Sequence, residues 1–214
     1  MTRSRSKIGD NRPVAEVRSL ALALLLALAC AGCAGTPESG KNDATGTPLP
    51  AAGISITLGP PVASTQTRVC NAVTAGAFTY EIGLPTPDQM IRDGTEGARV
   101  DCHVNGDGTF DAAISGVAAR ALLPASFSFS GVIRDKNAPV ENAGTMTSSS
   151  PDTGPLTGDV TGSPGCSFGP VVTFKQGAIL TDLDCPLLGS LDDDSTGCSA
   201  KGTIAFEGCT ASSE

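Results

Sequence analysis

The feature that most constrains the fold is a series of short segments in which apolar and polar residues alternate. Gly, Pro, Asn and Asp separate them, and the 214 residues include 26 Gly and 15 Pro. Alternation with a period of two over four to eight residues is typical of half-buried strands, and its repetition favours a sandwich or barrel. The clearest segments are 53–58, 78–82, 100–104, 110–114, 126–130, 171–174, 179–185 and 202–206. The sequence therefore predicts an all-β fold, an antiparallel β-sandwich.

Two regions do not alternate clearly. Residues 117–123 have a pattern that fits two helical turns, ended by Pro124. Residues 142–165 are rich in Ser, Thr, Gly and Pro, and indicate either one edge strand or a mostly irregular loop.

Six cysteines follow residue 53, and an even number in an exported chain indicates three structural disulfides. Six cysteines can pair into three disulfides in fifteen ways, and the sequence alone does not select one of them. Strand parity favours Cys166–Cys185, because both flank a hairpin about residues 175–177 and share a face with core residues, including Val172. The same reasoning pairs Cys102 with Cys198, since both lie on core-facing positions. Cys70–Cys209 is then expected as a clamp between the ends of the domain.

Charge and composition exclude several classes of protein. Acids outnumber bases by 22 to 14, and no basic patch is visible, which argues against nucleic acid. A single His excludes zinc sites that use two or three His ligands. No motif for a cofactor or for a catalytic nucleophile is present, so we expect neither cofactor nor enzyme activity.

The first 33 residues have the three parts of an export signal. Residues 1–18 carry five bases, an apolar run of about eleven residues follows, and small residues end it. The run is too short to span a bilayer, which needs about 20 apolar residues. The end, Leu28-Ala-Cys-Ala-Gly-Cys33, resembles the lipobox of bacterial lipoproteins, although Cys30 stands where that family usually has Leu.

The resemblance implies that Cys33 is acylated, is the first residue of the mature chain, and anchors it to membrane lipid. Cys30 is the alternative site, and ordinary secretion or a retained anchor is the remaining alternative. We therefore expect a signal peptide at 1–32, the lipidated Cys and a flexible tether at 33–52, and a β-sandwich domain at 53–211. The expected location is the cell envelope, on either the periplasmic or the surface face. Removal of the signal leaves 9 bases and 20 acids, so a partner attracted over long range would be basic.

Three features of the sequence are candidates for functional sites. Asp192, Asp193 and Asp194 are adjacent carboxylates and therefore weak candidates for calcium, with a solvated loop as the alternative. Residues 105–111 resemble a calcium loop, but Asn-Gly and Asp-Gly between two strands favour a hairpin turn. His103, the single His, is expected on an exposed strand position beside Cys102 rather than in a catalytic site.

The ending Cys198-Ser-Ala-Lys-Gly-Thr-Ile-Ala-Phe-Glu-Gly-Cys209 loosely resembles the ends of small envelope lipoproteins and implies no activity. The favoured interpretation is a membrane-anchored, non-catalytic envelope protein with a structural or protein-binding role. A calcium- or glycan-binding adhesin module is the first alternative, and a hydrolase or hydrolase inhibitor is the second. The absence of Trp and the single Tyr80 count against a sugar-binding cleft.

Overall fold

The computed structural model describes residues 48–62, 68–70, 78–119, 123–159, 163–190 and 192–211. The predicted signal peptide, Cys30 and Cys33 lie outside the described residues, as does the tether up to residue 47. Within the described part of the chain, no helix has the length and apolarity that crossing a bilayer requires.

The described chain is built almost entirely of antiparallel strands, with two single-turn 3-10 helices. The strands are β1 (Ala51–Gly59), β2 (Phe78–Ile82), β3 (Ile91–Arg92), β4 (Arg99–Val104), β5 (Thr109–Val117), β6 (Pro124–Val132), β7 (Ala143–Ser150), β8 (Gly154–Thr157), β9 (Cys166–Lys175), β10 (Ala178–Gly189) and β11 (Gly197–Glu207). The 3-10 helices are η1 (Thr95–Gly97) and η2 (Pro139–Glu141). The prediction of an all-β fold is confirmed.

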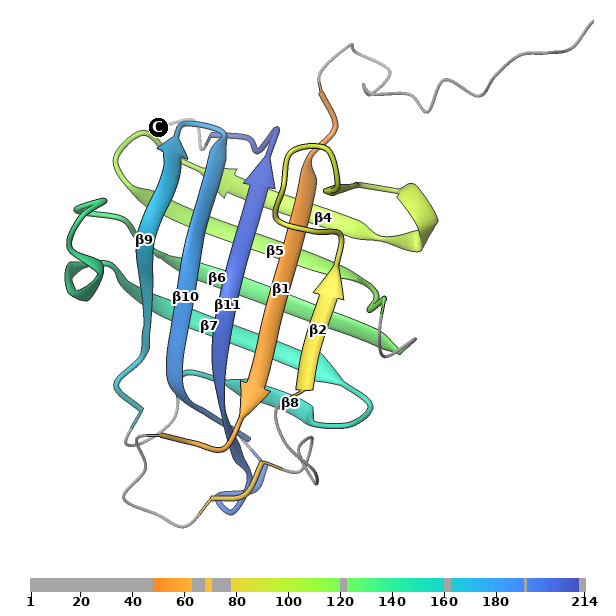
Figure 1. Cartoon of the computed structure of the whole chain (residues 1–214), viewed down its shortest axis with the longest axis vertical. Helices are drawn as coiled ribbons and strands as arrows, with labels where there is room; N and C mark the ends of the chain where they lie inside the picture. The colour runs from red at the N-terminus through yellow and green to blue at the C-terminus, as the bar shows by residue number, and fades with distance from the viewer. Residues whose placement is uncertain are drawn as a thin grey trace, which may run out of the picture. The chain divides into compact units, whose positions relative to one another are not determined.

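The strands are arranged in two layers. Both layers belong to one continuous sheet with the strand order β2-β1-β11-β10-β8-β7-β6-β5-β4. Figure 1 shows β9, β10, β11, β1 and β2 in one layer and β4 to β7 crossing behind them at a large angle. Both β8 and β9 pair with β10 and with β7, so they join the layers along one side. At the other side the Ala119 amide donates to the Glu81 carbonyl at 2.8 Å. The sheet thus folds over into a barrel-like arrangement and not into the antiparallel β-sandwich of two separate sheets.

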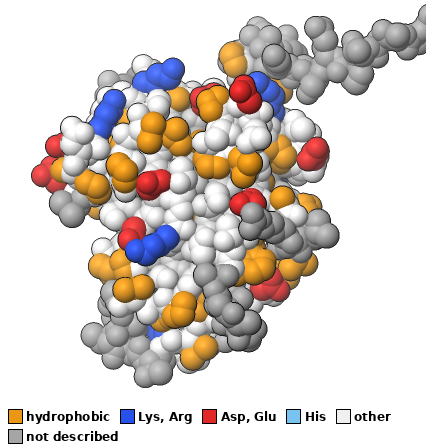
Figure 2. Space-filling view, viewed as in Figure 1, with side chains coloured by type: hydrophobic (Ala, Val, Ile, Leu, Met, Phe, Trp, Pro, Cys, Tyr) orange, Lys and Arg blue, Asp and Glu red, His pale blue; other side chains and the backbone are white. Residues whose placement is uncertain are grey.

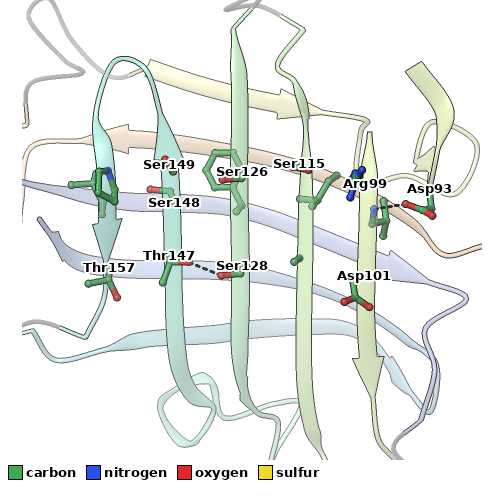
Figure 3. Close-up of a pocket in the computed structure, with 16 residues that line it drawn as sticks. Asp93, Arg99, Asp101, Ser115, Ser126, Ser128, Thr147, Ser148, Ser149 and Thr157 are labelled. Carbon is green, nitrogen blue, oxygen red and sulfur yellow. Dashed lines mark hydrogen bonds between the residues drawn. The ribbon is translucent and has the colours of Figure 1, made fainter. Parts of the chain in front are cut away.

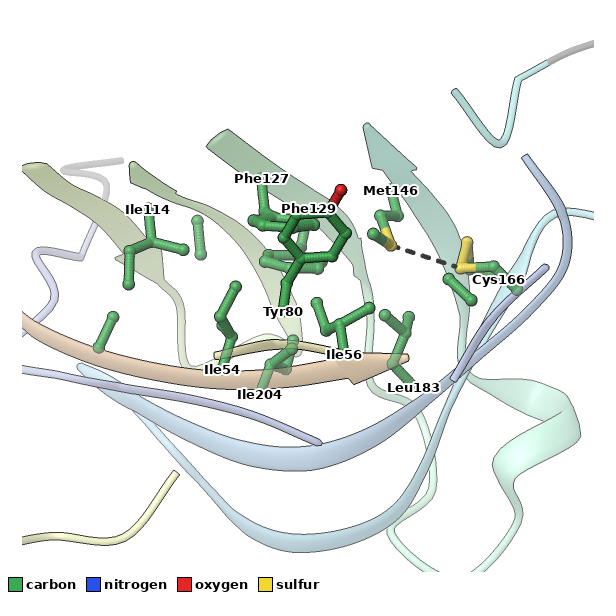
Figure 4. Packing of buried hydrophobic residues seen from close by; sticks show 14 of the residues in the cluster. Ile54, Ile56, Tyr80, Ile114, Phe127, Phe129, Met146, Cys166, Leu183 and Ile204 are labelled. Atoms are coloured by element: carbon green, nitrogen blue, oxygen red, sulfur yellow. Dashed lines mark hydrogen bonds between the residues drawn. A yellow bond between two sulfur atoms is a disulfide. The ribbon is translucent and has the colours of Figure 1, made fainter. Parts of the chain in front are cut away.

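The core lies between the layers and follows from the alternation of each strand. On β4, Val100, Cys102 and Val104 are buried while the intervening residues are exposed. Ring contacts cross the space between the layers, from Tyr80 to Phe127, from Phe129 to Phe206 and from Phe110 to Phe168. Figure 4 shows Ile54 and Ile56 of β1 facing the phenylalanines of β6. Burial of these side chains is the main source of stability, at about 2 kcal/mol for each large one.

The prediction of a helix at 117–123 is wrong for residues 117–119 and 123, which are the described residues of that range. β5 continues through Val117, and the Ala118 amide donates to the Leu123 carbonyl at 3.0 Å. The segment therefore turns from β5 into β6, and β6 begins at Pro124, the residue expected to end a helix. Strand pairing outweighs the weak helical pattern of so short a segment.

Residues 142–165 contain two strands, and β7 is not an edge strand. It lies between β6 on one side and β8 and β9 on the other. Its inward positions are Met146, Ser148 and Ser150, all buried. With a single apolar residue on the inner face, β7 carries almost no hydrophobic alternation, which explains why its sequence resembles a loop.

The disulfide Cys166–Cys185 is confirmed, and β9 and β10 form the expected hairpin. The inward position expected for Val172 is wrong, since its side chain is 69% exposed. On β9 Val171 lies three positions after Phe168, whereas their partners on β10, Thr181 and Leu183, are two positions apart. The extra residue exchanges the faces and buries Val171 instead.

The other two predicted disulfides are wrong, because the partners are exchanged. Cys102 is bonded to Cys209 and Cys70 to Cys198. The chain leaves β11 at Gly208, whose φ of 67° turns it away, so the parity of the strand does not extend to Cys209. The next residue, Thr210, exchanges backbone hydrogen bonds with β4 and brings Cys209 to Cys102.

Cys70 reaches Cys198 through a parallel bridge just before β11. Val69 pairs with Thr196, and the Gly197 amide donates to the Val69 carbonyl at 3.1 Å. This contact places residues 68–70 beside the start of β11. Cys70 therefore forms its disulfide with a cysteine of β11 and not with one of the C-terminal segment.

Tyr80 offers a direct optical test of the core, because the chain has one Tyr and no Trp. Burial raises the pKa of its phenol above the ordinary 10.0, while a 2.9 Å hydrogen bond to the Ser150 hydroxyl lowers the pKa in part. The unfolded chain ionises near pH 10 and the folded chain above it. We therefore expect stability to be unaffected by Tyr80 below pH 10 and to fall as pH rises above it.

The measurement is an absorbance titration of tyrosinate in buffer and in urea. We expect a higher midpoint for the folded chain, and a return to the ordinary value after unfolding. The same midpoint in both solutions would contradict the burial of Tyr80.

Candidate functional site

A groove on the outer face of the β4–β8 layer is the best-formed hollow of the described surface. Its volume is about 540 Å³, within the range of ligand sites. Small residues that point outward from β5, β6 and β7 form its floor. These are Ala113, Ser115, Ser126, Ser128, Thr147 and Ser149. Because the central side chains are short, the floor lies below the larger side chains at its sides.

Register across the strands sets the small floor residues in two rows. Ser115, Ser126 and Ser149 are opposite one another in the first row, and Ala113, Ser128 and Thr147 in the second. The Ser128 and Thr147 hydroxyls are hydrogen-bonded to each other. A hydroxyl both donates and accepts, so each retains capacity to bind a ligand.

The charged side of the groove comes from β4 and the segment before it. Figure 3 shows Arg99, Asp93 and Asp101 on one side of the hydroxyl rows and Thr157 on the other. The Asp93 carboxylate accepts from the Val100 amide at 2.9 Å, which fixes it at the edge of β4. The Asp101 side chain is 87% exposed and lies 4.0 Å from the His103 ring.

A second hollow of about 630 Å³ continues the groove toward the β5–β6 turn. Ser115, Ser126 and Ser149 line both hollows, so the two are contiguous. The second hollow adds the exposed Val117 and the Glu96 carboxylate. Two hollows and one continuous floor make this face a groove for an elongated ligand.

The outer face of the opposite layer differs from this face. Figure 2 shows its charged side chains dispersed, without a large patch of either sign over the described residues. Lys201 donates to Asp184 at 2.7 Å, and the Thr203 hydroxyl donates to Asp182 at 2.7 Å, so these polar groups are satisfied within the face. A hollow there measures only about 70 Å³. The β4–β8 face is therefore the stronger candidate for binding.

The acidic cluster at 192–194 does not gather into a metal site. Asp193 accepts hydrogen bonds from the Thr196 hydroxyl, the Ser195 amide and the Ser195 hydroxyl, which lower the pKa of its carboxyl. Asp194 lies 3.7 Å from the guanidinium of the buried Arg68, and Asp192 is exposed. The described residues include no group of three His, Cys, Asp or Glu side chains placed to hold a metal ion.

Residues 105–108 form the predicted hairpin turn between β4 and β5. The Thr109 amide and hydroxyl both donate to Asp107, at 2.9 and 2.7 Å, and these bonds lower the pKa of the Asp107 carboxyl. Asn105 donates through its amide to the Thr109 hydroxyl at 2.9 Å. The oxygens considered for calcium thus stabilise the turn.

His103 lies on the exposed face of β4, as predicted. Its Nδ1 is hydrogen-bonded to the Thr210 hydroxyl, which also lies 3.3 Å from the Cys102 carbonyl. The ring therefore joins the C-terminal segment to β4, next to the Cys102–Cys209 disulfide. A catalytic base would instead have to face a nucleophile within a cleft.

Comparison with known proteins finds no matching family model, no similar curated protein and no similar solved structure. Sequence reasoning also missed the groove, although Ser126-Phe-Ser-Phe-Ser130 carries a signal for it. The serines show that the outward-facing side chains of this segment are all small. Their neighbours on β5 and β7 are likewise small, but only the strand order brings the three together.

Proposed function

We propose that this chain is a lipid-anchored protein of the cell envelope whose β domain is a non-catalytic binding module. The observation that carries the proposal is the pairing of cysteines. All six cysteines of the domain form three disulfides, and the remaining two, Cys30 and Cys33, both belong to the segment that resembles a lipobox. Disulfides persist in oxidising compartments, which supports an exported protein.

The shape of the domain supports binding rather than catalysis. The groove presents hydroxyls and carboxylates, and its lining residues include no His or Cys. The floor hydroxyls of Ser128 and Thr147 are bonded to each other. The Asp93 carboxylate is bonded to the Val100 amide, so among the described residues no carboxylate is hydrogen-bonded to a floor hydroxyl. Hydroxyls that are not bonded to a base are poor nucleophiles but good hydrogen-bond partners.

A tether between Cys33 and β1 would hold such a module away from the membrane surface, because Gly-, Ser- and Pro-containing segments behave as flexible or extended spacers. The expected end of the tether is residue 52, but Ala51 and Ala52 are buried in β1, so it would end before Ala51.

The test is metabolic labelling with an alkyne-bearing fatty acid, applied to the natural chain and to Cys33→Ala and Cys30→Ala variants. We expect label and membrane association in the natural chain and in Cys30→Ala. We expect their loss in Cys33→Ala, since stable attachment needs two or more acyl chains. Loss of the label only in Cys30→Ala would place the acylated residue at Cys30 and not at Cys33. The absence of label in every chain would overturn the lipoprotein proposal.

A further inference from the structure

The groove on β4–β8 has no occupant from the described part of the chain, and its edges restrict how a partner can approach. On the exposed edge of β4, Asp93 accepts from the Val100 amide. Further along this edge, Thr210 accepts from the Val104 amide and donates to the Cys102 carbonyl. A partner strand therefore finds most of this edge occupied, and the outer face remains the accessible surface.

Charge at the groove favours a cationic partner. Three carboxylates border the two hollows, Asp93, Asp101 and Glu96, against a single base, Arg99. The carboxylates lie near both hollows, whereas the floor between them carries neutral hydroxyls. An excess of acids around a concave surface raises the local concentration of cations. The mature chain as a whole is also acidic.

The form of the groove favours an extended chain. Its floor spans β5, β6 and β7, about 10 Å at the usual strand spacing, which matches the width of one extended peptide with its side chains. Along β5 it extends from Ala113 to Val117, about 13 Å at the usual rise per residue. Hydroxyls on the floor can bond to peptide amides and carbonyls alike. Val117, 56% exposed, offers an apolar contact at one end.

A glycan fits these observations less well. Sugar-binding surfaces commonly present an aromatic ring to a sugar face. The one aromatic residue in the lining is Phe127, whose side chain points into the core and is 3% exposed. The groove therefore lacks the stacking surface that a neutral oligosaccharide would use.

We propose that the β4–β8 groove binds an extended, basic polypeptide segment, whose lysine or arginine side chains pair with Asp101 and Glu96 while its backbone lies over the serine rows. The inference rests on the proposed binding role of the domain and is independent of acylation. A basic residue near Asp101 and an apolar residue near Val117 would be separated by about four extended residues.

The experiment measures binding of fluorescent peptides to the whole mature protein in detergent. The probes are a peptide in which lysine alternates with serine, long enough to span both hollows, its glutamate counterpart, and a short oligomer of N-acetylglucosamine. We expect the lysine peptide alone to bind, more weakly at high salt because exposed charges are screened. Equal binding of both peptides, or binding of the oligosaccharide alone, would overturn the proposal.

Carboxylate variants locate the interaction. Asp101→Asn and Glu96→Gln are each expected to weaken binding by about threefold to fivefold, and together by about tenfold. The matched control is Asp192→Asn with Glu207→Gln, which removes two exposed carboxylates that do not line the groove, Glu207 lying on β11 of the opposite layer, and should leave the affinity within twofold. An equal loss of affinity in the control pair would mean that the net charge of the protein, and not the position of the carboxylates, determines binding. That result would contradict a site in the groove.

A steric variant tests the floor itself. Ser126→Leu places a bulky side chain where the two hollows meet, and is expected to reduce binding at least tenfold, whereas Ser126→Thr should retain most of it. Thermal unfolding of each variant verifies the fold, and the carboxylate variants decide the question if Ser126→Leu is unstable. Unchanged binding by a folded Ser126→Leu protein would place the peptide elsewhere. Labelling of Cys33 is unaffected by either result, so failure here leaves the lipoprotein proposal standing.

Discussion

Removing either long-range disulfide by a paired substitution to alanine is expected to lower the free energy of unfolding by about 5 kcal/mol. Cys70–Cys198 closes a loop of 128 residues and Cys102–Cys209 one of 107. Each cross-link restricts the unfolded chain, and the entropy removed grows with the logarithm of loop length. Typical domains have only about 5–15 kcal/mol of stability, so either loss brings the domain close to unfolding.

Cys166–Cys185 supplies the matched control, since it closes a loop of only 19 residues. Its removal is expected to cost about 3 kcal/mol. Urea unfolding of the three paired variants gives the comparison, and substituting both partners avoids a free thiol that would exchange with the remaining bonds. A larger loss for the short loop than for the long ones would show that native-state packing at the bonds outweighs loop closure.

Peptide mapping without reduction provides an independent check. Peptides that contain Cys102 and Cys209 should remain linked, as should those that contain Cys70 and Cys198. Recovery of a Cys102–Cys198 peptide would restore the pairing expected from strand parity and contradict the structure.

The strands were predictable because most of them separate apolar from polar residues with a period of two. β2 and β4 coincide with the expected segments to within a residue, and their buried faces are the expected ones. Parity failed where it was carried past the end of a strand or across a bulge within one. Gly208 ends the alternation one residue before Cys209, and the extra residue on β9 reverses the face of Val172. Local alternation thus predicts faces within a ladder, while bulges and turns are set by contacts distant in sequence.

The groove illustrates a different limit. Its serines are visible in the sequence as the outward positions of one strand, but the register that places small residues of the preceding and following strands beside them is not. β5 and β7 are both neighbours of β6, and β8 completes the groove only because it pairs with β7. A site made of small residues has no chemical signature in the sequence, since serine and alanine are common on any exposed strand. It becomes recognisable only when the sheet order is known.

Asn142 is a further residue that sequence reasoning passed over. It lies in the region interpreted as edge strand or loop, yet its side chain is completely buried. Its Oδ1 accepts from the amides of Arg134 and Asp135 at 2.8 and 3.0 Å. Its Nδ2 donates to the carbonyls of Asp135 and Phe168 at 2.6 and 3.0 Å. One side chain thus satisfies four backbone groups and joins the β6–β7 connection to β9.

Asn142→Ala is accordingly expected to lower the free energy of unfolding by about 3–5 kcal/mol, because it leaves backbone donors and acceptors without partners in the interior. Asn142→Asp keeps the acceptor but removes both donors and directs a carboxylate at two carbonyl oxygens, so we expect a loss of similar size at neutral pH. Urea unfolding measures both variants against the natural chain.

The matched control is Asn137→Ala in the same connection, where the side chain is exposed and only the backbone amide is bonded, to Asp135. Its effect should stay within about 0.5 kcal/mol. A small loss for Asn142→Ala would mean that water replaces the side chain at all four backbone groups. A large loss in Asn142→Ala with none in Asn137→Ala would locate the stabilisation in the buried amide, and would explain how this irregular connection is held between two strands.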